Sequence, residues 1–232
     1  MRPALGLLLV IGLLAAPGAA AAAEVSVMVV GKDRVLREPT EVKLSARSVK
    51  AGGRRCAVGA ASPLSVLAGT RLALRLKDYG SCGRSPRDAG SLYVSQVAGD
   101  RARGAQGWVY KVGNRAGTAG AGDPAVRVRD GQRVLWFWCL QNRGGQCQRT
   151  LDARPERTIV APGAALRVTV RGYDDAGRGI AVAGARVRLG TAEAVTGADG
   201  VATVAAPAAG SARLVAENAG MVRAFPRRVV VR

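Results

Sequence analysis

The chain has 232 residues, and its 35 Lys and Arg side chains against 16 Asp and Glu give a formal net charge of +19. It contains no histidine, which excludes Ser-His-Asp and Cys-His nucleophile systems and the common histidine-containing zinc and iron sites. The basic surplus suggests a polyanionic partner, whereas the missing histidine argues against most classes of enzyme. Composition therefore predicts a binding protein more readily than a catalyst.

Residues 1–23 have the pattern of a secretory signal peptide. Met1–Pro3 is short and basic, Leu5–Ala16 is apolar, and Ala21–Ala23 supplies small residues for a cleavage site. A permanent membrane anchor is the alternative, but it needs a span of roughly 20 apolar residues. We therefore expect cleavage near Ala23 and a secreted, extracytoplasmic mature chain without a membrane span.

The four cysteines are Cys56, Cys82, Cys139 and Cys147. An even number of cysteines in an exported chain favours disulfides. We favour the pairs Cys56–Cys82 and Cys139–Cys147, because each closes a polar loop rich in Gly and Arg beside a strand-like run. A zinc site of four thiolates is the alternative, but the sequence has no Cys-x-x-Cys spacing, so we expect no metal site.

The aromatic residues divide the chain into two parts. Seven of the nine lie before residue 148, as do all four cysteines. Together with the polar segment Asp152–Glu156, this change in composition predicts one domain at 24–152 and a second at 153–232. Both domains share the basic residues and neither contains a dense basic run, so we expect no specific nucleic-acid site.

In the first domain, a β-branched run at Val25–Val30 predicts a buried strand. Apolar and basic residues alternate over Leu72–Lys77 and over Val126–Arg129, which predicts half-buried strands with a basic outer face. A short helix is predicted at Ser62–Gly69, with serine as N-cap, proline at the first helical position and glycine as the C-terminal stop. The domain is therefore expected to be an α+β unit, mainly β, with one short helix.

The second domain has only strand patterns. Turn signals of Gly, Asp and Pro separate short apolar runs, which predicts an Ig-like or prealbumin-like β-sandwich and a protein that is mainly β. The runs expected to form strands are Thr158–Ala161, Leu166–Tyr173, Ala185–Leu189, Ala192–Thr196, Val201–Ala205, Ala212–Glu217 and Val222–Val231.

Two short motifs in this domain carry a family resemblance. Gly184–Val187 and Thr196–Ala202 resemble the GA-x-V … T-x-x-DG-x-A signature of bacterial Ig-like and carboxypeptidase-regulatory-like modules. The resemblance covers 158–232 and implies an extracellular β-sandwich rather than a particular function. Asp199 and Gly200 supply the expected hairpin turn, because glycine accepts a positive φ.

A second resemblance covers residues 60–138. Gly107–Asn114, followed by Val128–Trp138, is similar to the G-W-x-Y-x-V-N-G and L-x-D-G-D-x-V-x-W-x-Y elements of the β-grasp-like domain at the C-terminus of transcobalamin and intrinsic factor. Pro63–Leu67 matches the short helix of that family, and Leu92–Gly99 matches its Y-V-x-x-I-x-G strand. The resemblance implies a β-grasp-like fold for the N-terminal domain.

Two turns depart from the family pattern. Gly113-Asn114 replaces Asn-Gly, and Gly131-Gln132 replaces Gly-Asp. In the vitamin carriers this domain lies over the corrin, while a large helical barrel, which has no counterpart in this sequence, supplies most of the site. The resemblance therefore implies the fold more strongly than it implies a corrinoid ligand.

The aromatic strand around Trp136 offers the candidate ligand site. Alternation places Trp136 and Trp138 on one side of the strand and Phe137 on the other. One interpretation puts one face in the core and the other against the neighbouring domain. The alternative is an aromatic platform, made with Trp108 and Tyr110, that stacks on a ring or a sugar. These four residues, Trp108, Tyr110, Trp136 and Trp138, are the predicted ligand-binding residues.

No catalytic residues or cofactor are predicted. Asp174-Asp175 lies in a Gly-rich turn, where aspartate typically makes turn hydrogen bonds, and as a calcium pair it lacks further acidic ligands nearby. The sequence thus predicts an exported, non-enzymatic binding or structural module at the bacterial cell exterior that recognises a small ligand or wall component. The alternatives are a cobalamin-binding accessory protein and electrostatic binding to polyanionic wall polymers, and the oligomeric state is left open.

Overall fold

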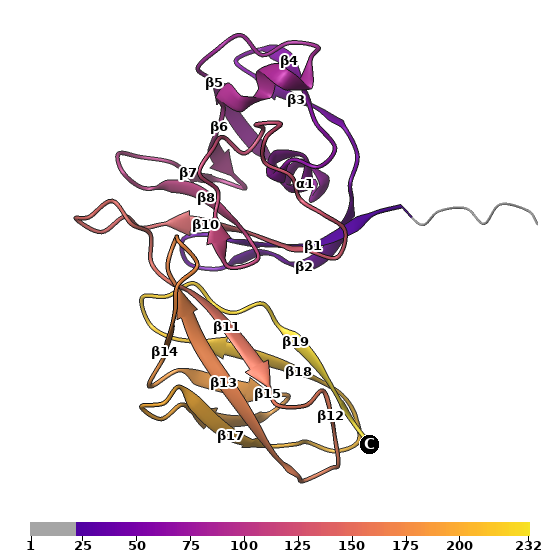
Figure 1. The fold of residues 1–232 in the computed structure, drawn as a ribbon, viewed down its shortest axis with the longest axis vertical. Helices are drawn as coiled ribbons and strands as arrows, with labels where there is room; N and C mark the ends of the chain where they lie inside the picture. Colours follow the sequence, from indigo (N-terminus) through magenta and orange to yellow (C-terminus); the bar gives the residue numbers. More distant parts are fainter. Residues whose placement is uncertain (1–21) are drawn as a thin grey trace, which may run out of the picture.

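Residues 22–232 are described by the computed structural model (Figure 1). The predicted signal peptide lies outside the described residues, apart from Ala22 and Ala23. Two bodies rich in β-strand are stacked along the long axis, with the N-terminal body above the C-terminal one in Figure 1. Within residues 22–232, no helix is both long enough and apolar enough to cross a membrane.

The sheet of the first domain that lies nearer the second domain is called the junction sheet here. Its two central strands, β1 and β10, run parallel, and the strand order is β2-β1-β10-β8-β9. Both faces of β1 are buried, because Val27 faces the core of the first domain and Met28 packs in a cluster shared with the second. Burial on both sides explains the continuous apolar run. The strands are β1 (Glu24–Val30), β2 (Val35–Lys43), β8 (Gly107–Val112), β9 (Arg115–Ala116) and β10 (Arg133–Cys139).

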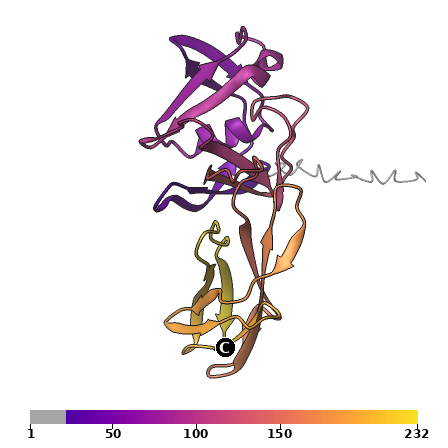
Figure 2. The same cartoon turned by 90° about the vertical axis from the view of Figure 1, so that its left-hand side faces the viewer.

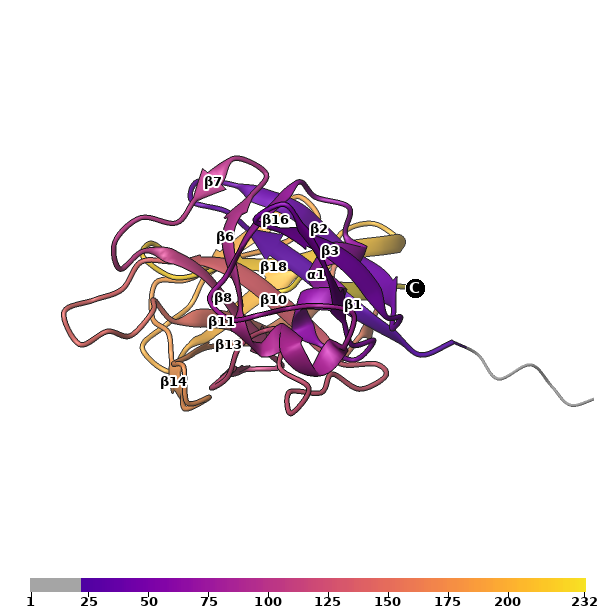
Figure 3. The same cartoon turned by 90° about the horizontal axis from the view of Figure 1, so that it is seen from above.

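The second sheet of the first domain, called the outer sheet here, has the order β4-β3-β5-β6-β7. The helix α1 lies between the two sheets, where it contacts β1, β2, β10 and β3 and lies over the junction sheet when seen from above (Figure 3). The elements are β3 (Arg47–Ala51), β4 (Arg54–Val58), α1 (Pro63–Gly69), β5 (Leu74–Asp78), the 3-10 helix η1 (Pro86–Ser91), β6 (Leu92–Val97) and β7 (Asp100–Arg101).

The predicted helix is confirmed at its N-terminus. Ser62 is the N-cap and accepts a hydrogen bond of 3.1 Å from the Ser65 amide to its Oγ, and Pro63 is the first helical residue. The C-terminus differs from the prediction, because Gly69 is the last helical residue and the cap is Thr70. A Cβ at Gly69 would collide with Val42, so glycine is required here for close packing and not as a left-handed stop.

The predicted strand at Val25–Val30 is confirmed as β1. The strand expected over Leu72–Lys77 begins two residues later, at Leu74. The prediction of a strand over Val126–Arg129 is wrong, because this segment is a loop. The apolar residue that gave the segment its strand-like alternation is Val128. It is buried within the loop, and its amide donates a hydrogen bond of 2.7 Å to the Ala61 carbonyl.

The second domain consists of two sheets that enclose one apolar core, and Figure 2 shows them side by side. In one sheet β13 pairs with β11, β14 and β17, and the other has the order β12-β19-β18-β15-β16. The strands are β11 (Thr150–Pro155), β12 (Ile159–Val160), β13 (Ala165–Tyr173), β14 (Gly179–Ala181), β15 (Arg186–Leu189), β16 (Ala192–Val195), β17 (Val201–Ala205), β18 (Gly210–Glu217) and β19 (Arg227–Val231).

All seven strands predicted for the second domain occur, although Val222–Val231 becomes a strand only from Arg227. The sequence missed β14 and β11, and β11 crosses the boundary expected between residues 152 and 153. The second domain thus begins at about Thr150. Gly200 has φ +75°, as the expected turn requires, but that turn connects β16 to β17, which belong to different sheets, and so it is not a hairpin.

The structure contains the disulfides Cys56–Cys82 and Cys139–Cys147, the pairing favoured from the sequence. The first joins β4 to the loop after β5, so it lies within the first domain. The second links the end of β10 to the segment that leads into β11, at the border between the domains. Two disulfides are typical of an oxidising environment outside the cytoplasm.

Candidate functional site

The four predicted aromatic residues meet on one face of two paired strands. Trp108 of β8 lies opposite Trp138 of β10, and Tyr110 lies opposite Trp136, with ring centroids 5.7 and 5.4 Å apart. All four are buried, with exposed fractions of 6 % or less. They belong to the core between the two sheets of the first domain. The outer sheet and α1 cover this face, so these side chains pack in the core, and a ligand-binding role for them stays a prediction.

The polar atoms of three of these four side chains also find partners inside the domain. The Trp136 Nε1 donates to the Pro63 carbonyl at 3.2 Å, and the Tyr110 hydroxyl donates to the Ala119 carbonyl at 2.9 Å. Burial raises the pKa of Tyr110 above its ordinary value, with a smaller contribution from Asp123. Three of the four predicted residues line a small cavity of about 200 Å³ between β6 and β8, and these are Trp108, Tyr110 and Trp136.

The opposite face of β10 contacts the second domain. Phe137 is fully buried in an apolar cluster with Met28 and Leu135 of the junction sheet and with Val222 and Phe225 of the second domain. The strand therefore has one face in a core and the other against the neighbouring domain. This cluster is the apolar centre of the domain junction.

Lys111 of β8 is a charged residue buried at the same junction. Its side chain is fully buried, and its ammonium donates to the Thr150 Oγ1 and to the carbonyls of Tyr173 and Asp174 at 2.9–3.1 Å. The Asp175 carboxylate lies 3.8 Å away. Burial lowers the pKa of Lys111 from 10.5 to about 8, against the opposing charges of Asp175 and Asp174. One lysine thus binds the first domain to a turn of the second.

The Asp174-Asp175 turn is a structural turn that completes this contact. Asp174 accepts hydrogen bonds from the backbone amide and the Nε of Arg178. The hydrogen bond from the backbone amide contributes most to lowering the pKa of Asp174. The Asp175 carboxylate accepts the amide of Cys147 at 3.0 Å. Within residues 22–232 no group of three or more Cys, Asp or Glu side chains is placed to hold a metal ion.

A second buried charge, Asp152 of β11, adds ion pairs at the junction. Its carboxylate accepts hydrogen bonds from Arg154 at 2.7 Å and Arg227 at 2.8 Å, and it lies 3.8 Å from Arg133 of the first domain. Burial raises the pKa of Asp152, but these hydrogen bonds outweigh burial and hold the pKa below its ordinary value. Charged groups as well as apolar ones therefore fix the two domains to each other.

Neither buried charge was predicted from the sequence. Lys111 lies in an apolar strand, GWVYKV, in which a lysine is unexpected unless one strand face is solvated. The side of β8 that carries Lys111 is covered by the second domain, and that covering cannot be derived from one strand. Asp152 and Arg154 interrupt the apolar pattern of β11, which is why this strand was not predicted.

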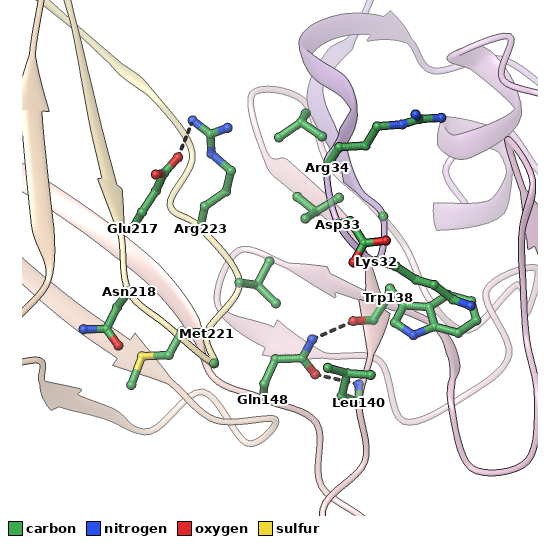
Figure 4. A pocket seen from close by; sticks show the side chains of 15 residues that line it. Lys32, Asp33, Arg34, Trp138, Leu140, Gln148, Glu217, Asn218, Met221 and Arg223 are labelled. Carbon is green, nitrogen blue, oxygen red and sulfur yellow. Dashed lines mark hydrogen bonds and ion pairs between the residues drawn. The ribbon is translucent and has the colours of Figure 1, made fainter.

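A groove of about 420 Å³, called the junction groove here, opens between the two domains (Figure 4). One wall is the turn between β1 and β2 together with Trp138 and Leu140, and the other wall is the loop after β18. In Figure 4 Lys32 and Asp33 extend from the first wall, and Glu217 and Asn218 lie on the second. Both domains therefore contribute to this site.

Polar groups of the junction groove are held in position by other side chains. Gln148 bridges the Trp138 carbonyl at 2.6 Å and the Leu140 amide at 2.7 Å. The Lys32 ammonium lies 4.5 Å from the centroid of the Trp138 ring, within cation–π range. Arg223 pairs with Glu217 at 3.2 Å. The groove thus presents groups of both charges on its walls, while the Trp138 ring beneath Lys32 is itself buried, and this arrangement suits a small polar ligand.

Among residues 22–232 the indole Nε1 of Trp138 is buried and has no hydrogen-bond partner. An unpaired buried N–H is uncommon, and it lies on a residue that borders the junction groove.

No protein-family model, no curated protein and no solved structure matches the chain.

Proposed function

We propose that this chain is an exported, non-enzymatic binding protein of the bacterial cell exterior, which holds a small polar ligand in the junction groove. The signal-peptide pattern of residues 1–23 and the two disulfides support export. The observation that carries the binding function is the groove itself, whose walls come from both domains and whose polar groups are already hydrogen-bonded in place. A preorganised site loses less conformational entropy when a ligand binds.

We also propose a β-grasp-like fold for the first domain and an Ig-like fold for the second. The adjacent parallel strands β1 and β10, flanked by β2 and β8 and covered by one helix, support the first assignment, together with the resemblance to the transcobalamin C-terminal domain. For the second, the two-sheet sandwich and the short strand β12, which runs parallel to β19, support an Ig-like module.

The rigidity of the junction supports binding in the groove rather than on the aromatic strand face. All four predicted ligand residues are buried, and among them Trp138 alone belongs to the lining of the groove. Because Lys111 and Asp152 fix the domains to each other, the groove walls keep their separation. We infer a ligand of about disaccharide size, since the volume is at the lower end of ordinary ligand sites.

The test is titration of the mature protein with N-acetylglucosaminyl-N-acetylmuramyl dipeptide, a small wall fragment, followed by amide NMR shifts and calorimetry. We expect saturable binding with shifts at the β1–β2 turn and at Gln148. Asp33→Arg, which inserts a long side chain at the wall of the groove, is expected to weaken binding at least tenfold. Asp88→Arg is the matched control, because it changes charge equally at an exposed position outside the groove. Equal effects of both variants, or no binding at all, overturn this function.

A corrinoid ligand is the alternative that the resemblance raised. It has less support, because the aromatic strand face that would contact a flat macrocycle is packed inside the first domain. Retention of the mature protein on a cobalamin resin, with elution by free cobalamin, would restore this alternative. Absence of retention removes it.

A further inference from the structure

Five cationic side chains project from one face of the outer sheet, and this surface is called the basic face here. They come from four different strands and all are exposed. Tyr93 of β6, 36 % exposed, lies among them. The cations are Arg55, Lys50, Arg75, Lys77 and Arg101.

Strand register aligns four of these cations in one row across the sheet. Lys50 lies directly opposite Arg55, and the parallel pair Ala51–Leu76 puts Arg75 beside Lys50. Arg75 pairs with Gln96, which pairs with Arg101. The row therefore crosses all five strands, a distance of about 19 Å at the usual spacing between strands.

None of these cations has a counterion among residues 22–232. The five side chains make no ion pair within this part of the chain, and the acidic residues of these strands, Asp78 and Asp100, belong to inward positions paired with Leu92 and Val97. The comparable outer surface of the second domain is different, because there Arg186 pairs with Glu193 and Arg188 with Glu217.

Like charges at directly opposite positions of neighbouring strands are destabilising. The Lys50–Arg55 pair therefore works against folding, and no acidic residue on this face compensates for it. A row of this kind is not expected from solubility alone, since scattered charges achieve solubility without opposed pairs. The cost is offset when an anionic ligand neutralises the row.

Two tyrosines lie at one side of the row. Tyr93 is opposite Lys77, and its ring centroid lies 6.1 Å from that of Tyr79, which is 73 % exposed. Burial raises the pKa of Tyr93, and Tyr79 adds to this effect. Exposed tyrosine rings beside cations offer flat apolar surfaces for stacking against sugar rings.

We propose that the basic face binds a linear acidic polysaccharide with a carboxylate on each sugar, laid across the strands along the cation row. Arginine matches carboxylates with two parallel hydrogen bonds, and the two tyrosines beside Lys77 would contact sugar rings at one side of the row. A single-stranded nucleic acid fits less well, since such sites use an electropositive groove with successive stacking aromatics and this face is a sheet surface with one tyrosine pair. The basic face is separate from the junction groove and is an additional binding site.

The experiment measures binding of the mature protein to polygalacturonate, with neutral dextran and a 20-nucleotide oligo(dT) as comparison probes. We expect polygalacturonate to bind most tightly, with log affinity falling against log salt at a slope of about −3.5 for five contacts. Lys50→Gln with Arg75→Gln is expected to weaken binding at least tenfold and to reduce the slope by about 1.4. The matched control is Arg129→Gln with Arg167→Gln, which removes two exposed arginines outside the face.

The outcomes separate a site from general attraction. Equal losses in the variant and its control overturn the proposal, because they would show that net charge alone attracts the polymer. Tighter binding of oligo(dT) than of polygalacturonate also overturns it, in favour of a nucleic-acid site. If the first variant fails to fold, Arg55→Gln with Arg101→Gln tests the two ends of the same row. Asp33→Arg in the junction groove leaves polygalacturonate binding unchanged, so failure of the groove and failure of the basic face are distinguishable.

Discussion

At the domain junction, the buried Lys111 donates hydrogen bonds to the second domain, and the buried Asp152 accepts them from two arginines of its own domain. The five cations of the basic face, in contrast, are exposed and unpaired among residues 22–232. A buried charge without a partner destabilises a protein by several kcal/mol, so the fold itself must supply the partners at the junction. Repulsion between exposed charges costs only tenths of a kcal/mol. An exposed row can therefore persist without a partner from its own chain and stay free for a ligand.

Among the variants that test this difference, Lys111→Met is expected to change the stability of the protein most. Methionine keeps much of the apolar stem but leaves the Thr150 hydroxyl, two carbonyls and the Asp175 carboxylate without their cation. We expect a loss of about 4 kcal/mol in the free energy of unfolding, measured with urea. Lys77→Met on the basic face is the matched control and should change stability by less than about 0.5 kcal/mol. A similar loss from both variants would contradict the contrast.

The pH dependence of the junction follows from the same lysine. The pKa of Lys111 is about 8 in the folded protein, below the ordinary lysine value of 10.5 that applies in the unfolded chain. Between these two pH values the unfolded chain therefore binds more protons than the folded protein. Stability then rises with pH from about 8 to 10.5, as burial of the charged ammonium is relieved. We expect a gain of roughly 3 kcal/mol relative to Lys111→Met over this window. If the difference in unfolding free energy between the wild type and Lys111→Met stays constant with pH, burial does not lower the pKa of Lys111.

Asp152→Asn is expected to have a smaller effect, of about 2 kcal/mol, because asparagine retains one oxygen for the arginines Arg154 and Arg227. Since the folded pKa of Asp152 is lowered, its stabilising contribution is present above the unfolded value near 3.9 and is lost as pH falls through the folded pKa. Urea unfolding of wild type and variant between pH 2 and 7 checks both statements. The two curves should converge at the acidic end, and a constant separation would contradict the assignment.

Much of the fold could be predicted because the local signals are strong. Ser62 and Pro63 predicted the start of α1, and the cysteine positions predicted both disulfides. The apolar run that became β1 was also correctly placed. These features depend on residues near one another in sequence or on a pattern within one element, and tertiary contacts reinforced them.

The sites could not be predicted in the same way. The basic face depends on register, which brings Lys50, Arg75 and Arg101 into one row although each stands apart in the sequence. The sequence therefore contains no dense basic run that would predict this face. The junction groove depends on how one domain lies on the other, and the aromatic strand looked like a binding face because the elements that cover Trp136 are distant in sequence.

The smallest effect is the most direct test of whether the basic face opposes folding. Neutralising the row with Lys50→Gln and Arg75→Gln removes the Lys50–Arg55 repulsion, and we expect stability to rise by about 0.5 kcal/mol in low salt. The gain should shrink as salt is raised towards 1 M, where screening already weakens the repulsion in the wild type. Thermal unfolding at two salt concentrations measures this, with Arg129→Gln and Arg167→Gln as the control. A double variant that is less stable than its control at both concentrations would mean that these cations stabilise the sheet, and that no ligand is needed to offset repulsion between them.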